Sequence, residues 1–365
     1  MKEERKPKYY VLMDNLRKDI ERGIIQPGDK IESENQLAEK YKMSRHTVRK
    51  ALSILESEGY IVAEHGRGTF CKERDMSIKS TKNVAVVTTY ISDYIFPRLI
   101  QGMYQTLDEE GYSVIIKNTG NSPKLEGKIL QELIDKNIDG LIIEPSKSEI
   151  YSENVELYKK LDEYRIPYVF IHATYPQLED KPHIVMDDIG GAKILTQHLI
   201  DLGHKRIAGV FKADDNQGAE RHRGYIEGLT SNGMTYDPNI VALFHTEDKD
   251  YKPVAEVLKW VKSGEKIDGI VCYNDQIAYE IAAALRNEGI RIPEDVSLTG
   301  FDNLAMPWMN DLRITTIAHP REHFGEKAAR LLIEKINHVS DADSKIARVV
   351  ESKLIVGNSC ADRRG

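Results

Sequence analysis

MSRHTVRKALSILESEG, residues 43–59, is the stretch from which the organisation of the chain can be worked out. Its apolar residues recur at helical spacing, at Val48, Leu52 and Leu55. One face of a helix here would therefore pack inward. Ser44 has a side chain that caps helix N-termini, and Gly59 suits the left-handed residue that ends a helix. The stretch predicts one amphipathic helix with a defined start and stop.

The opposite face of this helix is basic and polar. It carries Arg45, His46, Thr47, Arg49, Lys50 and Ser53. A helix that enters the major groove contacts base edges with its N-terminal residues, and the forked guanidinium of arginine suits guanine and phosphate oxygens. We therefore predict that this face binds DNA. The alternative is a solvated helix face, since most runs of charge simply contact water.

The flanking sequence predicts the rest of a small domain. Apolar spacing predicts an amphipathic helix over residues 7–23, and Ser33–Gln36 has the form of a capping box that opens a second helix. Two apolar runs, 60–63 and 69–71, flank a glycine-rich basic tip and indicate a hairpin. Together these elements predict a winged helix-turn-helix.

Composition and charge limit the remaining possibilities. A chain of 365 residues predicts two or three domains, and the absence of an eighteen-residue apolar run excludes a membrane span. No membrane partner is expected. The charged start leads to no apolar secretory segment, so we expect a cytoplasmic protein. Cys71, Cys272 and Cys360 lie far apart, which indicates reduced thiols and no disulfide or metal site.

The net charge of −7 is unevenly distributed along the chain. Residues 1–75 carry a net charge of +2 and the remainder −9. Between Lys40 and Lys50 there are five basic residues and no acidic one. Local positive charge of this kind can neutralise phosphates without making the whole protein basic.

The rest of the chain has a different pattern. A polar segment, 73–82, predicts a linker between a DNA-binding domain, 1–72, and a larger domain, 83–365. In the larger domain, apolar runs alternate with amphipathic stretches; the runs are 84–87, 114–116, 141–143, 168–171, 207–210, 270–272 and 296–298. This alternation predicts an α/β fold of parallel sheets covered by helices, and its length suggests two lobes.

The N-terminal motifs resemble a known family. The series IIQPGDKIESENQLAEKYKMSRHTVRKALSILESEGYIVAEHGRGTF resembles the winged helix-turn-helix of GntR-type bacterial regulators. The resemblance implies contact with operator DNA by Glu34, Arg45, Thr47, Arg49, His65 and Gly66. The helix start and the basic tip add Ser44, His46 and Arg67 to the predicted DNA-binding residues.

A second series of motifs resembles the effector domain of LacI/GalR regulators and the related periplasmic sugar-binding proteins, over roughly residues 83–357. It consists of TTYISDYIFPRLIQGMYQTLDEEGYSVII, DGLIIEPS, ERHRGYIEGL, DGIVCYNDQIAYEIAAAL, VSLTGFDN and TTIAHPREHFGEKAARLLI. End to end, the chain resembles the arabinose repressors of Gram-positive bacteria. The resemblance implies a homodimer whose effector, L-arabinose, binds between two lobes and releases a palindromic operator.

Candidate sugar-binding residues follow the predicted strands, because ligands of open α/β sheets bind at the carboxyl ends of strands. In chain order they are Asp93, Phe96, Glu144, His172, Asn274, Asp275 and Asp302. Planar polar groups suit neighbouring sugar hydroxyls, and a ring suits the C–H face. By resemblance, Arg221, Asn274 and Asp302 match sugar-binding residues of the family.

Other candidates are less regular. His172 stands where relatives often have aspartate and His319 where they often have glutamine, which indicates a different ligand from that of the best-known members. Tyr251 is a candidate stacking ring. Structural alternatives exist throughout: helix capping for Asp302, a surface ion pair for Arg221, capping or pairing for Asp93 and Glu144, and packing for His172, His319 and Tyr251.

An enzyme is the main alternative to a sugar-responsive repressor. A dinucleotide enzyme needs a glycine-rich turn after its first strand, yet residues 88–93 contain no glycine. No Walker motif, metal-ligand spacing or Gly-x-Ser-x-Gly elbow is visible, so we expect neither an enzyme nor a cofactor. A further alternative is that the larger domain senses another sugar or binds a small co-repressor.

The predicted homodimer follows from the length of one recognition helix, which covers only a few base pairs. We expect the larger domain, 83–365, which we call the body, to hold the dimer together. Within the helix 97–110, the candidates for an exposed apolar contact are Ile100, Met103, Tyr104 and Leu107.

Overall fold

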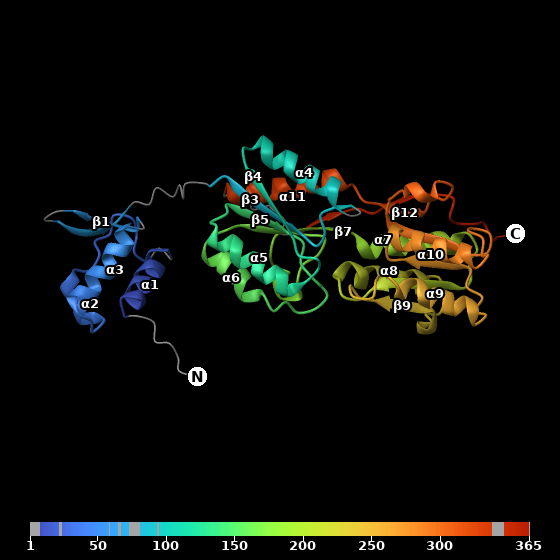
Figure 1. The fold of residues 1–365 in the computed structure, drawn as a ribbon, viewed down its shortest axis with the longest axis horizontal. Coiled ribbons are helices and arrows are strands. Elements are labelled where there is room, and N and C mark those ends of the chain that lie inside the picture. Colours follow the sequence, from blue (N-terminus) through green and yellow to red (C-terminus); the bar gives the residue numbers. More distant parts are fainter. Residues whose placement is uncertain are drawn as a thin grey trace. The chain divides into compact units, whose positions relative to one another are not determined.

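The computed structural model of the chain describes residues 8–21, 24–57, 59–64, 67–72, 81–92, 95–337 and 347–364. The chain forms two compact units, Met1–Ser80 and Thr81–Gly365 (Figure 1). Across the described ranges, no helix is long and apolar enough to cross a membrane.

The first unit contains three helices and a hairpin: α1 (Lys8–Glu21), α2 (Glu34–Lys40), α3 (Arg45–Ser57), β1 (Ile61–Glu64) and β2 (Gly68–Cys71). The predicted capping box begins α2, where Ser33 N donates to Gln36 Oε1 at 2.9 Å and Gln36 N donates to Ser33 Oγ. At α3, Thr47 N donates to Ser44 Oγ at 3.2 Å, and Gly59 has a φ of 76°. Both predicted ends of α3 are confirmed.

The core of this unit lies between the three helices and the hairpin. Its buried apolar residues include Leu12, Leu16, Leu37, Val48, Leu52 and Leu55. Each contributes about 1.5–3 kcal/mol of burial free energy. The inward apolar face of α3, predicted from helical spacing, is confirmed. Because this core fixes the orientation of α3, the basic face of the helix stays in water.

The second unit has two lobes, each built on a six-stranded sheet. The first lobe contains β3 (Asn83–Thr88), α4 (Phe96–Glu109), β4 (Ser113–Asn118), α5 (Pro123–Asp135), β5 (Gly140–Ile143), α6 (Val155–Glu163), β6 (Tyr168–Ile171), β7 (His183–Met186), α11 (Arg321–Ile336) and β13 (Ala347–Val350). Its strand order is β13-β7-β6-β5-β3-β4, and all of these strands are parallel.

The second lobe contains α7 (Asp188–Asp201), β8 (Ile207–Lys212), α8 (Asn216–Ser231), β9 (Val241–Phe244), α9 (Lys252–Lys262), β10 (Gly269–Cys272), α10 (Asp275–Asn287), β11 (Ser297–Asp302), β12 (Thr315–Ala318) and β14 (Lys353–Ile355). Its strand order is β14-β12-β11-β10-β8-β9, with only the β12–β14 pair antiparallel among its described strands. The predicted fold class, a winged helix-turn-helix and a two-lobed α/β body, is confirmed.

The chain crosses between the lobes three times. The crossovers lie between β7 and α7, between β12 and α11, and between β13 and β14. Two of them are bonded to each other, because Ser352 Oγ donates to the carbonyl of Asp187 at 2.8 Å and Asp187 N donates to the carbonyl of Val350 at 2.9 Å. The third starts beside them, since Ala318 at the end of β12 pairs with Lys353 of β14. The three crossovers therefore form one hinge.

One expectation about α4 was wrong. Ile100, Met103 and Leu107 are buried, and of the four candidates only Tyr104 is exposed, at 48%. The reason is α11, which packs along α4 (Figure 1). A Cβ atom at Gly102 would lie 2.1 Å from the carbonyl oxygen of Glu322, so glycine permits the close approach of the two helices.

Candidate functional site

The basic face of α3 is accessible in the first unit. The side chains of Arg45, His46 and Arg49 are exposed, and Thr47 is half-buried beneath them. Because this face stands at the start of a helix fixed by its own core, it can enter a groove of DNA without rearrangement of the unit.

Arg49 is held in place by Glu34 at the start of α2. Its Nε and Nη2 donate to the two carboxylate oxygens of Glu34 at 3.0 and 2.8 Å. The hydrogen bonds from Arg49 lower the pKa of Glu34. Glu34 and Arg49, which were both predicted to contact DNA, therefore form one two-pronged pair that holds the guanidinium in one orientation.

The hairpin carries a further predicted residue. Arg67 is exposed and its Nη1 donates to Glu64 Oε2 at 2.6 Å. His65 and Gly66 at the hairpin tip, and Asp93 in the body, lie outside the described residues.

The body has a cavity of about 170 Å³ lined by residues of both lobes. The sequence-predicted residues that line it are Phe96, Glu144, His172, Arg221, Asn274 and Asp302. All but Arg221, which lies within α8, stand at strand ends or helix starts, as expected for parallel sheets.

In the first lobe, the cavity wall contains a buried carboxylate and a buried imidazole. Glu144 accepts from Thr89 N at 2.8 Å through one oxygen, and its other oxygen lies 2.8 Å from His172 Nδ1. Burial would raise the pKa of Glu144, but the hydrogen bonds from His172 and Thr89 lower it, so the carboxylate is charged.

In the second lobe, Arg221 of α8 is a fully buried cation. Its Nε donates to Asp188 Oδ1 at 2.7 Å and its Nη1 donates to the carbonyl of Tyr273 at 2.8 Å. The guanidinium carbon lies 3.7 Å from the ring centroid of Phe301. Nη2 has no hydrogen-bond partner among the described residues and lies 4.0 Å from Asp302 Oδ1.

The electrostatics of this group follow from its burial. Burial raises the pKa of Asp188 to about 6, and the opposite charge of Arg221 limits the rise. Burial would lower the pKa of Arg221, but Asp188 and Asp302 raise it, so the guanidinium stays charged.

Two site residues adopt backbone conformations that are uncommon outside glycine. Asp302 has a φ of 93° and His172 a φ of 65°, each at the end of a strand. Such conformations persist where the surrounding structure fixes them, and they cluster at binding sites. Asn274 has a double role, because it lines the cavity and its Oδ1 accepts from Ile277 N at the start of α10.

Three predicted sugar-binding residues do not line the cavity. Tyr251 precedes α9 with its side chain 64% exposed, so a stacking role is not supported. Asp275 is fully buried beneath the cavity, where it accepts from Leu304 N at 2.6 Å. His319 lies behind His172, with their Nε2 atoms 3.2 Å apart, and burial lowers its pKa well below the usual range. It lies in the crossover between β12 and α11, at the hinge.

Sequence reasoning missed several residues of the site. Lys212 ends β8, Asp215 caps α8 and Tyr273 follows β10, and all three line the cavity. Their position after strands could have identified them. Asp188 gave no comparable signal, because its role depends on Arg221, which lies 33 residues away in the sequence.

The chemistry of the cavity suits a small polar molecule. It offers the carboxylate of Glu144 in the first lobe, charged donors and acceptors in the second lobe, and the ring of Phe96 as an apolar surface. The described residues contain no group of three or more His, Cys, Asp or Glu side chains that could hold a metal ion.

Comparison with known proteins identifies both parts. The family model described as bacterial regulatory proteins, gntR family, matches residues 8–71, and the periplasmic binding protein-like domain matches 196–360. The chain is 39% identical to the arabinose metabolism transcriptional repressor of Halalkalibacterium halodurans, over 98% of this chain and 97% of that one. It is 38% identical to the repressor of the same name from Geobacillus stearothermophilus, over 98% and 99%.

A solved structure extends the likeness to three dimensions. The cellobiose complex of the transcriptional regulator CelR matches with a TM-score of 0.67 and 25% identity, over 86% of this chain and 90% of that one. The full-length relatives are transcriptional repressors, so the expectation that the chain is not an enzyme is confirmed. The chain therefore belongs to the family of arabinose metabolism transcriptional repressors, in which a GntR-type head precedes a periplasmic-binding-protein-like body.

Proposed function

We propose that this repressor binds a palindromic operator as a homodimer and releases it when L-arabinose binds between the lobes. The observation that carries the proposal is the pair formed by Arg221 and Asp302 in the cavity. A buried guanidinium nitrogen, Nη2 of Arg221, has no hydrogen-bond partner among the described residues and stands 4.0 Å from the buried carboxylate of Asp302. A sugar hydroxyl can accept from the first and donate to the second.

The choice of ligand rests on chemistry and on relatives. Glu144, Asn274 and Asp302 offer the planar groups that neighbouring hydroxyls need, and Phe96 offers a ring for the C–H face. Two relatives are named for arabinose metabolism, and the similar CelR structure contains cellobiose. L-arabinose is therefore the first sugar to test.

Asp302→Asn is the variant that tests this site. It keeps the shape of the side chain but removes the charged acceptor, and we expect about a tenfold or greater rise in the sugar concentration that releases operator, equivalent to about 1–3 kcal/mol. A mobility-shift titration with L-arabinose measures the effect. Operator affinity without sugar should match that of the wild type, because α3 is unchanged.

Asp311→Asn is the matched control, since Asp311 is an exposed aspartate of the same lobe that pairs with Arg286. It should release operator at the wild-type concentration. If Asp302→Asn did the same, Asp302 would not be a ligand. If L-arabinose failed to release the wild type, the proposed effector would be wrong.

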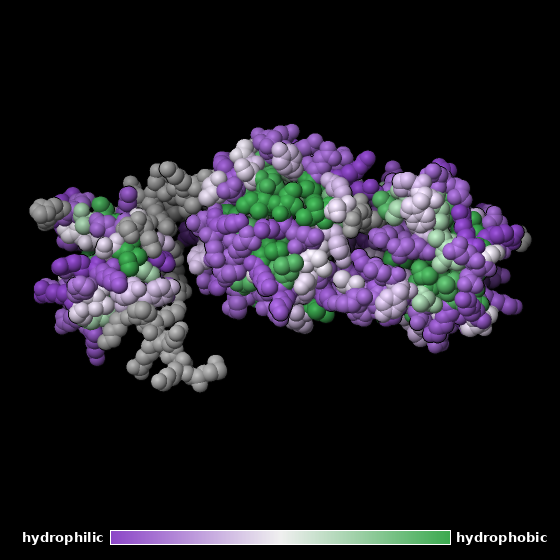
Figure 2. All heavy atoms as spheres, viewed as in Figure 1, coloured by the Kyte–Doolittle hydropathy of each residue, from purple (hydrophilic) through white to green (hydrophobic). Residues whose placement is uncertain are grey.

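Dimerisation is supported by an apolar area on the first lobe. Figure 2 shows it over the strands at the open edge of the sheet, where β4 pairs only with β3 among the strands that the structure describes. Ile116 of β4 is 40% exposed, and Tyr104 of α4 and Leu125 of α5 are exposed on the helices that flank it. Apolar areas of this kind mark protein contacts.

We predict that Ile116→Asp weakens the dimer, because a charge would replace apolar surface that a second copy buries. Sedimentation at a series of concentrations should show a dimer for the wild type and a larger monomer fraction for the variant. Ile150→Asp, at an exposed isoleucine on a loop of the same lobe, is the control. A wild-type chain that stays monomeric while binding a palindrome tightly would contradict the homodimer.

A further inference from the structure

The lobes touch each other at a second place besides the hinge. The hinge strands β13, β7, β12 and β14 lie at one end of the two sheets. The second group of interlobe contacts comes from loops that follow β4 and β5 in one lobe and β8 and β9 in the other, at the opposite end of the strand orders. The cavity between the lobes is therefore bounded by covalent crossovers on one side and by noncovalent contacts on the other.

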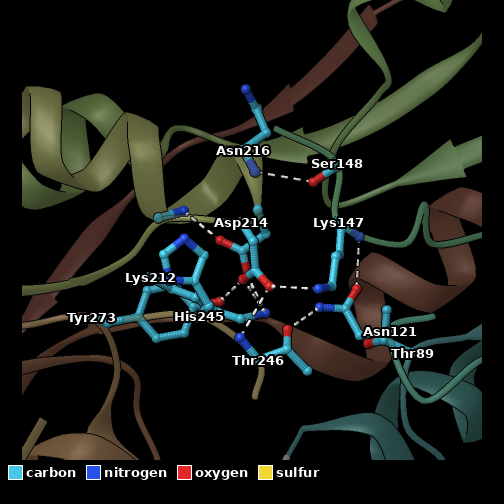
Figure 3. Close-up of polar contacts among 12 residues, drawn as sticks. Thr89, Asn121, Lys147, Ser148, Lys212, Asp214, Asn216, His245, Thr246 and Tyr273 are labelled. Carbon is cyan, nitrogen blue, oxygen red and sulfur yellow. Dashed lines mark hydrogen bonds and ion pairs between the residues drawn. The ribbon is translucent and has the colours of Figure 1, made fainter. Parts of the chain in front are cut away.

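Lys147 is the centre of these contacts (Figure 3). Its Nζ lies 3.7 Å from Asp214 Oδ2 and also forms an ion pair with Glu247, both in the other lobe. Its backbone N–H donates to Asn121 Oδ1 at 2.8 Å, and Asn121 Nδ2 donates across the gap to Thr246 Oγ1 at 2.6 Å. Lys147 thus takes part in both kinds of interlobe contact: its side chain forms the ion pairs, and its backbone holds the Asn121 side chain that bonds to Thr246.

Asp214 connects this group to the cavity. It is buried, and its Oδ2 accepts from Thr246 N at 2.9 Å. Its Oδ1 lies 3.5 Å from Nζ of Lys212, which lines the cavity and pairs with Asp215 at 3.0 Å. One carboxylate is therefore shared between a lysine of the cavity and a lysine of the opposite lobe.

A second bridge lies beside the first. Asn216 N, at the start of α8, donates to Ser148 Oγ at 3.0 Å (Figure 3). Ser148 follows Lys147 and also lines the cavity. The bridging residues are therefore continuous with the ligand site but belong to neither the predicted ligands nor the hinge.

We propose that Lys147, Asp214, Asn121 and Thr246 form an interlobe latch that holds the cavity closed and sets the affinity for the effector. Lys147, Asp214 and Thr246 do not line the cavity, so they are positioning residues that act on the ligand through the closure of the lobes, whereas Asn121 also lines the cavity. The contacts of Lys147 lie across the cavity from the hinge, so an opening of the lobes about the hinge would break them. A ligand that touches both lobes needs the same closed arrangement. Latch and ligand therefore stabilise the same state, and a smaller closed fraction raises the apparent Kd by the same factor.

Lys147→Met tests the latch, because it removes the charge and keeps most of the side-chain volume. Calorimetry with L-arabinose should show an affinity about five- to tenfold weaker than that of the wild type. The difference should shrink as salt is raised, since salt screens the ion pairs of the wild type. Lys147→Arg should restore most of the affinity. Lys136→Met, at an exposed lysine of the same lobe that pairs with Glu132, should have no effect.

A second measurement needs no ligand. Hydrogen exchange of the ligand-free full chain should be faster in Lys147→Met than in the wild type within residues 119–122 and 244–247, and unchanged in Lys136→Met. The choice of sugar rests on the proposed function, and the two ideas fail separately. If the wild type bound no L-arabinose, the proposed effector would be wrong, while the exchange result would still decide on the latch. Wild-type exchange and wild-type affinity in Lys147→Met would overturn the latch.

Discussion

Arg221→Leu is expected to lower the free energy of unfolding of the body by about 3–5 kcal/mol, because it leaves the buried carboxylate of Asp188 without its cation. Urea unfolding followed by tryptophan fluorescence can measure this. Both tryptophans, Trp260 and Trp308, lie in the same lobe as Arg221. Sugar-dependent release of operator should be lost as well.

The loss of unfolding free energy in Arg221→Leu should depend on pH. Burial already raises the pKa of Asp188 to about 6 in the folded protein, and removal of Arg221 raises it further. A carboxyl group whose pKa is higher in the folded than in the unfolded protein favours the folded state while it is protonated. The free energy of unfolding therefore falls as the pH rises through the folded pKa. The difference between variant and wild type should therefore shrink below about pH 6 and grow above it.

Arg223→Leu is the matched control, since Arg223 lies on the same helix, is exposed and pairs with Glu227. Its effect should stay within about 0.5 kcal/mol. Equal stability of Arg221→Leu and the wild type at neutral pH would show that the buried pair contributes nothing. The double variant Asp188→Leu/Arg221→Leu should regain part of the loss, because no charge then stays buried without a partner.

The second large effect concerns the head. Arg45→Ala and Arg49→Ala are each expected to cost about 1–3 kcal/mol of operator affinity if the arginine contacts guanine, with relaxed preference at one base pair. A phosphate contact would instead weaken all sequences alike and lower the salt slope by about one unit. Affinities over a salt series and a set of operator variants separate the two roles.

Glu34→Gln extends this test, because it breaks the two-pronged pair but leaves Arg49 in place. If Glu34 orients Arg49, this variant should lose part of the base preference that Arg49→Ala loses. Arg330→Ala, at an exposed arginine of the body paired with Glu326, is the control and should bind operator normally. Normal binding by both Arg45→Ala and Arg49→Ala would exclude α3 as the reading helix.

The head could be predicted almost completely because its signals are local. The Ser33 capping box, the Ser44 cap and the left-handed Gly59 each act within a few residues, and the structure contains all three. In the body, each of the seven predicted runs lies within a strand or overlaps one. β7, β9, β12, β13 and β14 were not predicted. β12 and β13 contain only two consecutive apolar residues each, whereas β9, VALF, has an apolar run as long as those of the predicted strands and was missed.

Contacts between distant segments explain the errors. Helical spacing showed that α4 has an apolar face but could not show that α11, more than 200 residues later, covers it. In the cavity, strand ends located Glu144, Asn274 and Asp302. His319 meets His172 only because the crossovers bring the two lobes together. Asp188 pairs with Arg221 because α7 packs on α8 within the second lobe, which local spacing could not show.

The three crossovers also determine the order in which the protein can be completed during synthesis. The head is continuous in sequence, so all its elements exist once residue 80 has been made. The first lobe needs α11 and β13 from the far end of the chain, and the second lobe needs β14. Because domains fold as units as the ribosome releases them, the DNA-binding part can fold early, whereas neither lobe of the body can close its core until nearly the whole chain has emerged.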